Sequence, residues 1–276
     1  MFDTEKVNLS GVPETLLWPL FNRAHEARRP DALLHDPLAV ELAGRIDYPF
    51  EKNFGRADEG APLRALGFDD EIKCYLAEHP DATVVALGDG LETQFWRVDN
   101  GRLKWISVDL PETIALRNKL LPAHERLTQF VCSALDYNWM KQVDPSRGVF
   151  ISAQGLLMYF KPDEVAKLIT ECAARFPGGA MMFDTAPRWV SNMTLSRRGW
   201  KKTKDYRVPA MPWGVNIGEL QGMRAWHPNV QEIHQVTLAR GHGFVFKFIV
   251  PLINRLPLIR DKLPAMVLLR FGGGKT

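Results

Sequence analysis

The sequence predicts an α/β protein built on a mostly parallel, doubly wound sheet. Short apolar runs of strand length recur at regular intervals, helical patterns fill the gaps, and a glycine turn follows the first run. Strands that alternate with helices of this length form right-handed βαβ units, so we expect helices on both faces of the sheet. The strand-like runs are Thr83–Leu87, Lys104–Asp109, Thr128–Cys132, Val149–Ala153 and Ala180–Asp184.

The chain before the first strand is expected to be mainly helical, and residues 1–80 should form an N-terminal helical cap. Apolar residues recur at helical spacing over residues 13–28, and an Asp-Pro pair starts a second helix over residues 36–44. Prolines and glycines indicate an irregular connection at residues 47–62. A further helix should cover residues 64–79.

The second half of the chain contains one clear helix and one segment that departs from the alternation. Residues 162–175 combine a proline at the first helical position, acidic residues in the first turn and an apolar stripe. Residues 186–228 are rich in proline, aromatic and basic residues, and we expect them to form a helical and aromatic lid. Residues 232–238 and 244–250 should form a final antiparallel hairpin, which completes seven strands, and the apolar tail should be helical or extended.

The composition is that of an ordinary soluble enzyme. A chain of 276 residues, 46% hydrophobic and 24% charged, can form one large domain with a buried core. The net charge of +3 does not by itself indicate nucleic acid or a membrane as partner. Three scattered cysteines argue against a disulfide framework and lack zinc-binding spacing, and the first residues do not resemble a signal peptide. We therefore expect a single cytoplasmic domain, residues 1–276, without a metal; the sequence does not indicate its oligomeric state.

A glycine turn after the first strand marks the expected ligand site. Gly88 and Gly90 can bring backbone NH groups close to a ligand, and Asp109 follows about 20 residues later, where a carboxylate can bind ribose hydroxyls. This pattern suits a ligand with an adenosine group. A dinucleotide fingerprint needs a third glycine where Thr93 stands, which counts against an NAD(P)-dependent oxidoreductase. Three alternatives stay open at this point. The protein could be such an oxidoreductase or a non-catalytic nucleotide-binding protein, or the glycines could form a purely structural turn with Asp109 as a helix cap.

Residues 84–97, VVALGDGLETQFWR, resemble the first motif of the leucine carboxyl methyltransferase family, including its bacterial branch of polyketide-tailoring O-methyltransferases. The similarity extends from about Thr15 to Asp184 and, more weakly, to the end of the chain. It implies a class I, Rossmann-like methyltransferase fold with S-adenosyl-L-methionine (SAM) as methyl donor. Further agreeing blocks are Arg23–Glu26 with Asp36-Pro37, Arg64 with Phe68-Asp69, Val108–Pro111, and Gln154–Tyr159.

The resemblance also implies roles for individual residues of this chain. The glycine turn would lie against the amino acid portion of the donor, Asp109 would hold the ribose, and the segment after the third strand would contact adenine. Arg64 would face the donor carboxylate, and Arg23 would lie near donor and acceptor as the catalytic residue. The cofactor-binding residues expected on this basis are Arg64, Gly88, Asp89, Gly90, Asp109, Leu110, Ser133, Ala134, Leu135, Gln154 and Gly155.

Two of these positions depart from the family pattern. Family members commonly have Asp where this chain has Ala134, and Glu where it has Gln154. An amide offers a cationic donor only its dipole in place of a charge. Donor binding should therefore survive at Gln154 but be weaker.

The expected reaction is methyl transfer to an oxygen atom. Such a displacement requires mainly that the acceptor oxygen is aligned with the methyl group in a water-poor pocket. A carboxylate is a competent nucleophile at neutral pH, whereas a phenol would gain from a base. We therefore predict esterification of a small-molecule carboxylate oriented by an arginine. Methylation of a hydroxyl and methylation of a protein's C-terminal carboxylate are the alternatives.

The aromatic residues of the lid would form either an apolar wall for a flat acceptor or a small core of the lid itself. The sequence does not distinguish these two roles. The basic stretch at residues 197–207 has a composition also found in proteins that bind single-stranded nucleic acid. Because the net charge is low, a solvated surface is favoured over RNA binding there. The aromatic residues are Trp189, Trp200, Tyr206, Trp213 and Trp226.

Overall fold

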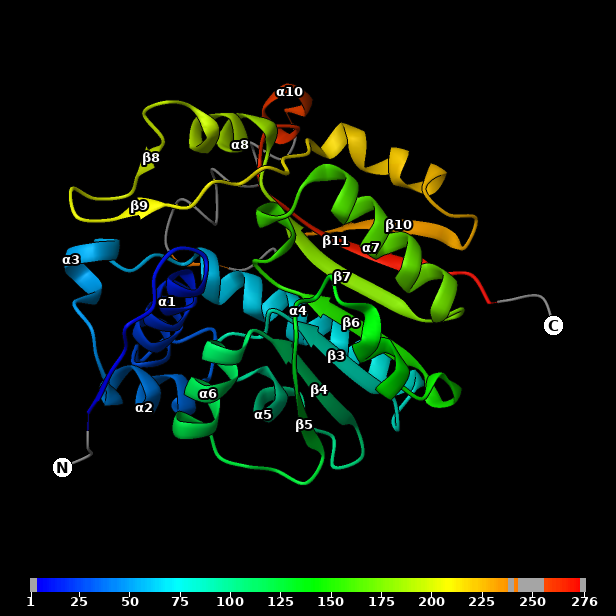
Figure 1. Ribbon diagram of the computed structural model, residues 1–276, viewed down its shortest axis with the longest axis horizontal. Helices are drawn as coiled ribbons and strands as arrows, with labels where there is room; N and C mark the ends of the chain where they lie inside the picture. Colours follow the sequence, from blue (N-terminus) through cyan, green and yellow to red (C-terminus); the bar gives the residue numbers. More distant parts are fainter. Residues whose placement is uncertain (1–3, 238–240, 243–255, 274–276) are drawn as a thin grey trace.

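A seven-stranded sheet forms the centre of the computed structural model, which describes residues 4–237, 241–242 and 256–273 (Figure 1). The strand order is β10-β11-β7-β6-β3-β4-β5. Only β11 runs antiparallel to its neighbours, and the remaining pairs are parallel. The strands are β3 (Thr83–Leu87), β4 (Lys104–Asp109), β5 (Leu127–Val131), β6 (Val149–Ala153), β7 (Ala180–Thr185), β10 (Val230–Val236) and β11 (Ala265–Phe271).

The central strands are buried on both faces, as the continuous apolar runs in the sequence predict. The register pairs Leu87 of β3 with Val108 of β4, and Ala86 of β3 with Ser152 of β6. This register brings the carboxyl ends of three parallel strands to one edge of the sheet. β3 lies between β4 and β6, so the strand order reverses there, at the place where open α/β sheets bind ligands.

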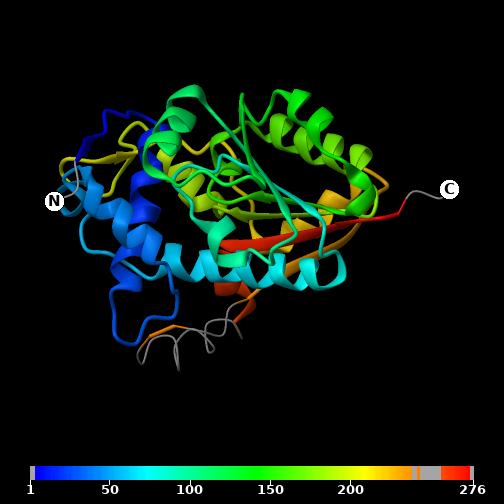
Figure 2. The same cartoon turned by 90° about the horizontal axis from the view of Figure 1, so that it is seen from below.

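Helices cover both faces of the sheet. On one face, α4 (Gly60–Glu78) and α5 (Gln94–Val98) pack Phe68, Ile72 and Phe95 against Val84 and neighbouring sheet residues. On the other face, α7 (Pro162–Arg175) packs its apolar stripe against β3, β6 and β7. Figure 2 shows α4 and α7 on opposite sides of the sheet. Between β4 and β5 the chain forms α6 (Pro111–Leu120), which begins at a proline as expected.

The N-terminal helices and the lid share a hydrophobic cluster beside the sheet. The Phe54 ring stacks on the Trp18 ring, with 5.9 Å between the ring centres. It also meets the Tyr206 ring of the lid edge-on, with 4.9 Å between the ring centres. The lid hairpin therefore rests on the N-terminal helices (Figure 1). The N-terminal elements are β1 (Glu5–Lys6), η1 (Pro13–Leu16), α1 (Leu17–Ala27), α2 (Pro37–Arg45), β2 (Ile46–Asp47) and α3 (Phe50–Phe54). The lid comprises α8 (Arg188–Leu195), β8 (Trp200–Lys201), β9 (Arg207–Val208) and η5 (Ile217–Ala225).

The strands and helices predicted before residue 186 are confirmed, most within a residue or two at each end. Two details differ from the prediction. The connection expected at residues 47–62 contains the short helix α3 and the first turn of α4. The partner of β10 is β11, in the apolar tail, whereas the strand predicted at residues 244–250 lies outside the described residues.

Short helices complete the described chain: η2 (Tyr137–Gln142), η3 (Pro145–Arg147), η4 (Leu157–Tyr159) and α10 (Pro257–Arg260). Across residues 4–237, 241–242 and 256–273, no helix combines the length and apolar character needed to cross a bilayer.

Candidate active site

A cavity of about 570 Å³ lies at the carboxyl ends of β3, β4, β6 and β7, and it extends between α1 and the lid. Its floor is the glycine turn. Gly88 and Gly90 have φ of +62° and +48°, values that side chains rarely adopt. A Cβ atom at Gly88 would lie 2.8 Å from Leu156 Cδ1, so the turn also leaves no room for one. The sequence therefore requires glycine at Gly88 for both backbone shape and close packing.

Asp109 accepts two backbone hydrogen bonds, one of which fixes it to the glycine turn. Its carboxylate accepts from the NH groups of Gly90 and Leu110, each at 2.7 Å. Burial raises the pKa of Asp109, and these NH donors partly oppose that effect. Each carboxylate oxygen can accept a second hydrogen bond. The group is thus positioned at the end of β4 to receive the hydroxyls of a ribose.

Asp89 anchors the turn from behind, and its side chain does not point to a ligand. Its carboxylate pairs with Arg117 at 2.8 Å and also accepts from Trp105 and Ser107. Arg117 in turn donates to the carbonyl of Gly90 at 2.6 Å. Burial raises the pKa of Asp89, and the neighbouring guanidinium opposes this. Asp89 lines the cavity, as the sequence analysis expected of a cofactor-binding residue, but its carboxylate supports the turn, so its part in binding stays a prediction.

Arg64, Gly155 and Asp184 meet on the other side of the cavity. Arg64 Nη1 lies 2.8 Å from Asp184 Oδ2, and Gly155 donates its NH to Asp184 Oδ1 at 2.5 Å. A Cβ atom at Gly155 would lie 3.2 Å from the Arg64 guanidinium. Arg64 Nε is buried without a hydrogen-bond partner among the described residues. In the sequence Asp184 marks only the end of a strand, and its pairing with Arg64, 120 residues away, has no local signal.

Gln154 is held by Glu92. Gln154 Nε2 donates to Glu92 Oε2 at 2.9 Å, while Gln154 Oε1 is buried without a partner among the described residues. Glu92 also pairs with Arg23 and Arg97, each at 2.8 Å. Burial by itself would raise the pKa of Glu92, but the two guanidiniums lower it to about 2. A charged carboxylate therefore lies directly behind the amide and fixes its orientation.

Arg23 uses all three guanidinium nitrogens within the protein. Nε pairs with Asp36 at 3.2 Å, Nη1 with Glu92 at 2.8 Å, and Nη2 donates to the carbonyl of Leu91 at 2.8 Å. Only 2% of its side chain is exposed. Arg97 continues this buried network to Asp36 and Asp69. Every guanidinium nitrogen of Arg23 thus already contacts a protein group, which indicates that Arg23 positions the glycine-turn segment.

The segment after β5 contributes part of what was expected. Ser133 and Ala134 line the cavity together with Cys132, whereas Leu135 is not among the lining residues. The carbonyl of Ala134 accepts from Trp139 Nε1 at 3.1 Å. Among these lining residues, Ser133 carries a hydroxyl group that can form a hydrogen bond with a ligand.

The lid aromatics divide between the two predicted roles. Trp200 lines the cavity. Tyr206 and Trp213 are buried in hydrophobic clusters, and Trp189 is 52% exposed. Within the basic stretch, Lys202 lies 4.4 Å from the centre of the Trp18 ring and 3.6 Å from Asp58. This lysine therefore links the lid to the N-terminal helices.

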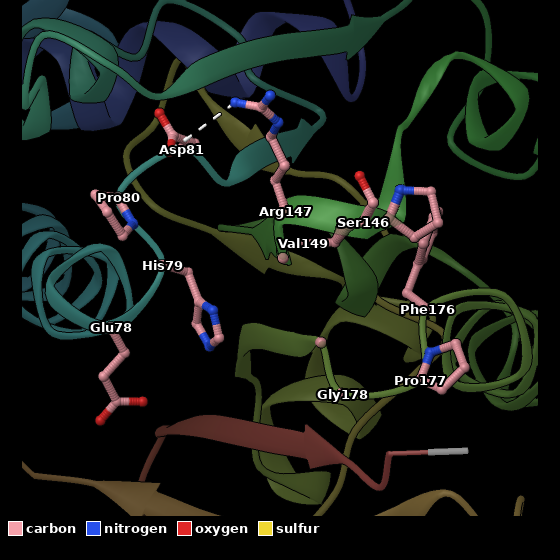
Figure 3. Close-up of a pocket in the computed structure, with 13 residues that line it drawn as sticks. Glu78, His79, Pro80, Asp81, Ser146, Arg147, Val149, Phe176, Pro177 and Gly178 are labelled. Atoms are coloured by element: carbon pink, nitrogen blue, oxygen red, sulfur yellow. Dashed lines mark ion pairs between the residues drawn. The ribbon is translucent and has the colours of Figure 1, made fainter. Parts of the chain in front are cut away.

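A second cavity, of about 640 Å³, lies at the amino ends of β3 and β6 (Figure 3). Its lining is polar and mixed in charge, with an ion pair between Arg147 and Asp81 at 3.9 Å. Figure 3 shows His79 and Glu78 on the side of α4, facing Phe176 and Pro177 across the opening. Because open α/β sheets bind ligands at the carboxyl ends of their strands, we place the active site in the first cavity.

The sheet order, the glycine turn and the acid at the end of β4 define a protein of the class I methyltransferase type. The family model for leucine carboxyl methyltransferase matches residues 17–173, and the chain belongs to this family. It is 30% identical over 230 residues to the tetracenomycin polyketide synthesis O-methyltransferase TcmP of Streptomyces glaucescens, covering 82% of this chain and 83% of that protein.

A second relative and one solved structure are also similar to this chain. The chain is 30% identical over 218 residues to the S-adenosyl-L-methionine-dependent methyltransferase dpfgK of Gibberella zeae, covering 70% of this chain and 72% of that protein. Among solved structures, the CurJ carbon methyltransferase is similar with a TM-score of 0.50 and 13% identity, covering 98% of this chain and 72% of that one. At this identity the structural similarity concerns the fold alone.

Proposed function

We propose that this protein is a SAM-dependent O-methyltransferase that acts on a small molecule. Its family membership and its similarity to relatives named as SAM-dependent methyltransferases support the donor and the reaction class. TcmP is named for polyketide synthesis, which supports a polyketide-like acceptor. The observation that carries the proposal is the glycine turn with Asp109 fixed to it, beside Gln154 and Arg64 in one cavity.

The residues of the cavity fit SAM. Gln154 Oε1 is a buried acceptor without a partner among the described residues, and it suits the donor's ammonium group. Arg64, with its unpartnered Nε, suits the donor carboxylate, Asp109 the ribose, and Ser133 the adenine. When bound, SAM supplies a methyl group on a positively charged sulfur.

The protein's contribution to the reaction is positioning and exclusion of water. Glu92 holds the Gln154 amide so that its carbonyl is directed to the donor, and Arg23 and Arg97 hold Glu92 in turn. The lid and α1 cover the acceptor side of the cavity with apolar side chains. We infer that Arg23 is a positioning residue, because its contacts argue against the acceptor clamp expected from the sequence.

The reacting group of the acceptor is a carboxylate or a hydroxyl. The similarity to TcmP, which is named for polyketide synthesis, supports a small molecule over the chain end of a protein. The oxidoreductase alternative is set aside by membership of a methyltransferase family. Thr93, which replaces the third glycine, donates its hydroxyl to Asp36 and so belongs to the buried network.

The proposal is tested by incubating the purified protein with SAM carrying a labelled methyl group and either 2-naphthoic acid or 2-naphthol. Labelled product with release of S-adenosylhomocysteine is the expected result. Mild alkali then separates the two acceptor chemistries, because it removes label from a methyl ester and not from an aryl ether. A protein that neither binds S-adenosylhomocysteine nor consumes SAM would contradict the proposal.

A further inference from the structure

The acceptor side of the cavity has a wall built from α1 and the lid. Trp18 and Trp200 form its aromatic part, with ring centres 6.3 Å apart and planes inclined by 68°. Leu16, Val190 and Met211 add aliphatic surface to the same lining. Large aromatic and aliphatic surfaces of this kind favour a flat, apolar ligand.

The Trp18 ring is held by contacts with its faces. It stacks on Phe54 at 5.9 Å with only 10° between the planes, and Lys202 Nζ lies 4.4 Å from its centre. Asp58 holds that ammonium group at 3.6 Å. A ligand in the cavity therefore meets the edge of this indole more readily than its faces.

The indole NH of Trp18 is a donor without an acceptor. Trp18 Nε1 is buried, yet no described residue accepts its hydrogen bond. A buried donor left unpaired costs free energy, and such groups normally have a partner. Trp139 is also buried in a hydrophobic cluster, but its indole NH donates a hydrogen bond to the Ala134 carbonyl. The unpaired NH of Trp18 thus marks a place where a ligand can supply the acceptor atom.

We propose that Trp18 is a specificity residue for the methyl acceptor, which is a planar aromatic molecule with a hydroxyl or carbonyl oxygen that accepts the hydrogen bond of Trp18 Nε1. This inference rests on the proposed methyltransferase function and names the acceptor class for the same cavity. An acceptor atom is required to satisfy the NH, and a hydroxyl or carbonyl oxygen supplies one. A planar ring system is required because Trp18 and Trp200 leave an aromatic wall beside it.

The test uses two probes of nearly equal size and shape, 2-naphthol and 2-methylnaphthalene, which differ in one oxygen. Binding of S-adenosylhomocysteine is first measured by calorimetry, and each probe is then titrated into the saturated complex. The wild-type protein is expected to bind 2-naphthol more tightly than 2-methylnaphthalene. The Trp18→Phe variant keeps a ring but lacks the NH, so its affinity for 2-naphthol should fall about tenfold. Its affinity for 2-methylnaphthalene should not change.

Trp200→Phe is the matched control, because it makes the same chemical change on the facing ring. It should leave the preference for 2-naphthol intact. Failure of 2-naphthol to bind the saturated complex overturns the acceptor class, and equal loss of 2-naphthol affinity in both variants overturns the role of Trp18. An unchanged affinity of Trp18→Phe for 2-naphthol also overturns the role of Trp18, because water would then be the group that satisfies the NH in the wild-type protein. Failure of S-adenosylhomocysteine itself to bind is a different result, which contradicts the proposed function.

Discussion

Replacing Glu92 by Gln is expected to destabilise the protein by about 3 kcal/mol at pH 7. Burial by itself would raise the pKa of Glu92, but Arg23 and Arg97 lower it from 4.5 to about 2. At about 1.36 kcal/mol for each pH unit, this difference of about 2.5 corresponds to about 3 kcal/mol. Breaking a buried ion pair typically costs about 3–5 kcal/mol, an independent estimate of the same size.

The effect has a defined pH dependence. Because the folded-state pKa of Glu92 is lowered, its stabilisation is fully present above about pH 4.5 and is lost as the pH falls toward about 2. The difference in unfolding free energy between wild type and Glu92→Gln should therefore be equal at pH 7 and pH 5. At pH 3.5 it should shrink to about 2 kcal/mol.

Urea unfolding followed by tryptophan fluorescence measures this difference at each pH. The control is Asp81→Asn, which removes an exposed ion pair with Arg102 and should leave the midpoint unchanged. A Glu92→Gln variant as stable as wild type at pH 7 would refute the reasoning. So would a difference that stays constant down to pH 3.5.

Three further predictions concern donor binding, measured by titration with S-adenosylhomocysteine. Gly88→Ala should lower the affinity at least about tenfold, because alanine is strained at a φ of +62° and its Cβ would contact Leu156. The control is Gly101→Ala, at a φ of +80° but with open space around it. Equal effects of the two variants would contradict the role of the glycine turn in donor binding. Asp109→Asn should cost about tenfold through weaker hydrogen bonds to ribose, and an unchanged affinity would remove Asp109 from the site. Gln154→Leu should weaken S-adenosylhomocysteine about tenfold but leave 5′-methylthioadenosine, which lacks the amino acid portion, unaffected. Equal losses for both ligands would show that Gln154 acts on the fold.

The parts of the fold that the sequence predicted correctly depend on local patterns. β3, β4 and β6 are short apolar runs bounded by turn residues, and α7 begins at a proline with acidic residues in its first turn. β11 was harder to predict, because a short apolar run in isolation is compatible with helix or strand. Its pairing with both β7 and β10 decides the outcome, and that pairing joins segments far apart in the chain.

The candidate site shows the same division. Gly88, Gly90 and Asp109 could be predicted, because a turn and an acid at a fixed spacing after two strands form a local pattern. The support of Gln154 by Glu92 spans 62 residues of sequence, and that of Arg64 by Asp184 spans 120. No spacing in the sequence indicates such partners. For the same reason the sequence could not show that Arg23 is already occupied by the protein's own groups.

The cavity at the carboxyl ends of β3 and β4 is the proposed binding site of the sulfonium donor. Calorimetric titration of the purified protein with S-adenosylhomocysteine, and separately with NAD, tests it most directly. We expect saturable binding of one S-adenosylhomocysteine per chain, weakened by Asp109→Asn, and no binding of NAD. Binding of NAD without any binding of S-adenosylhomocysteine would contradict it.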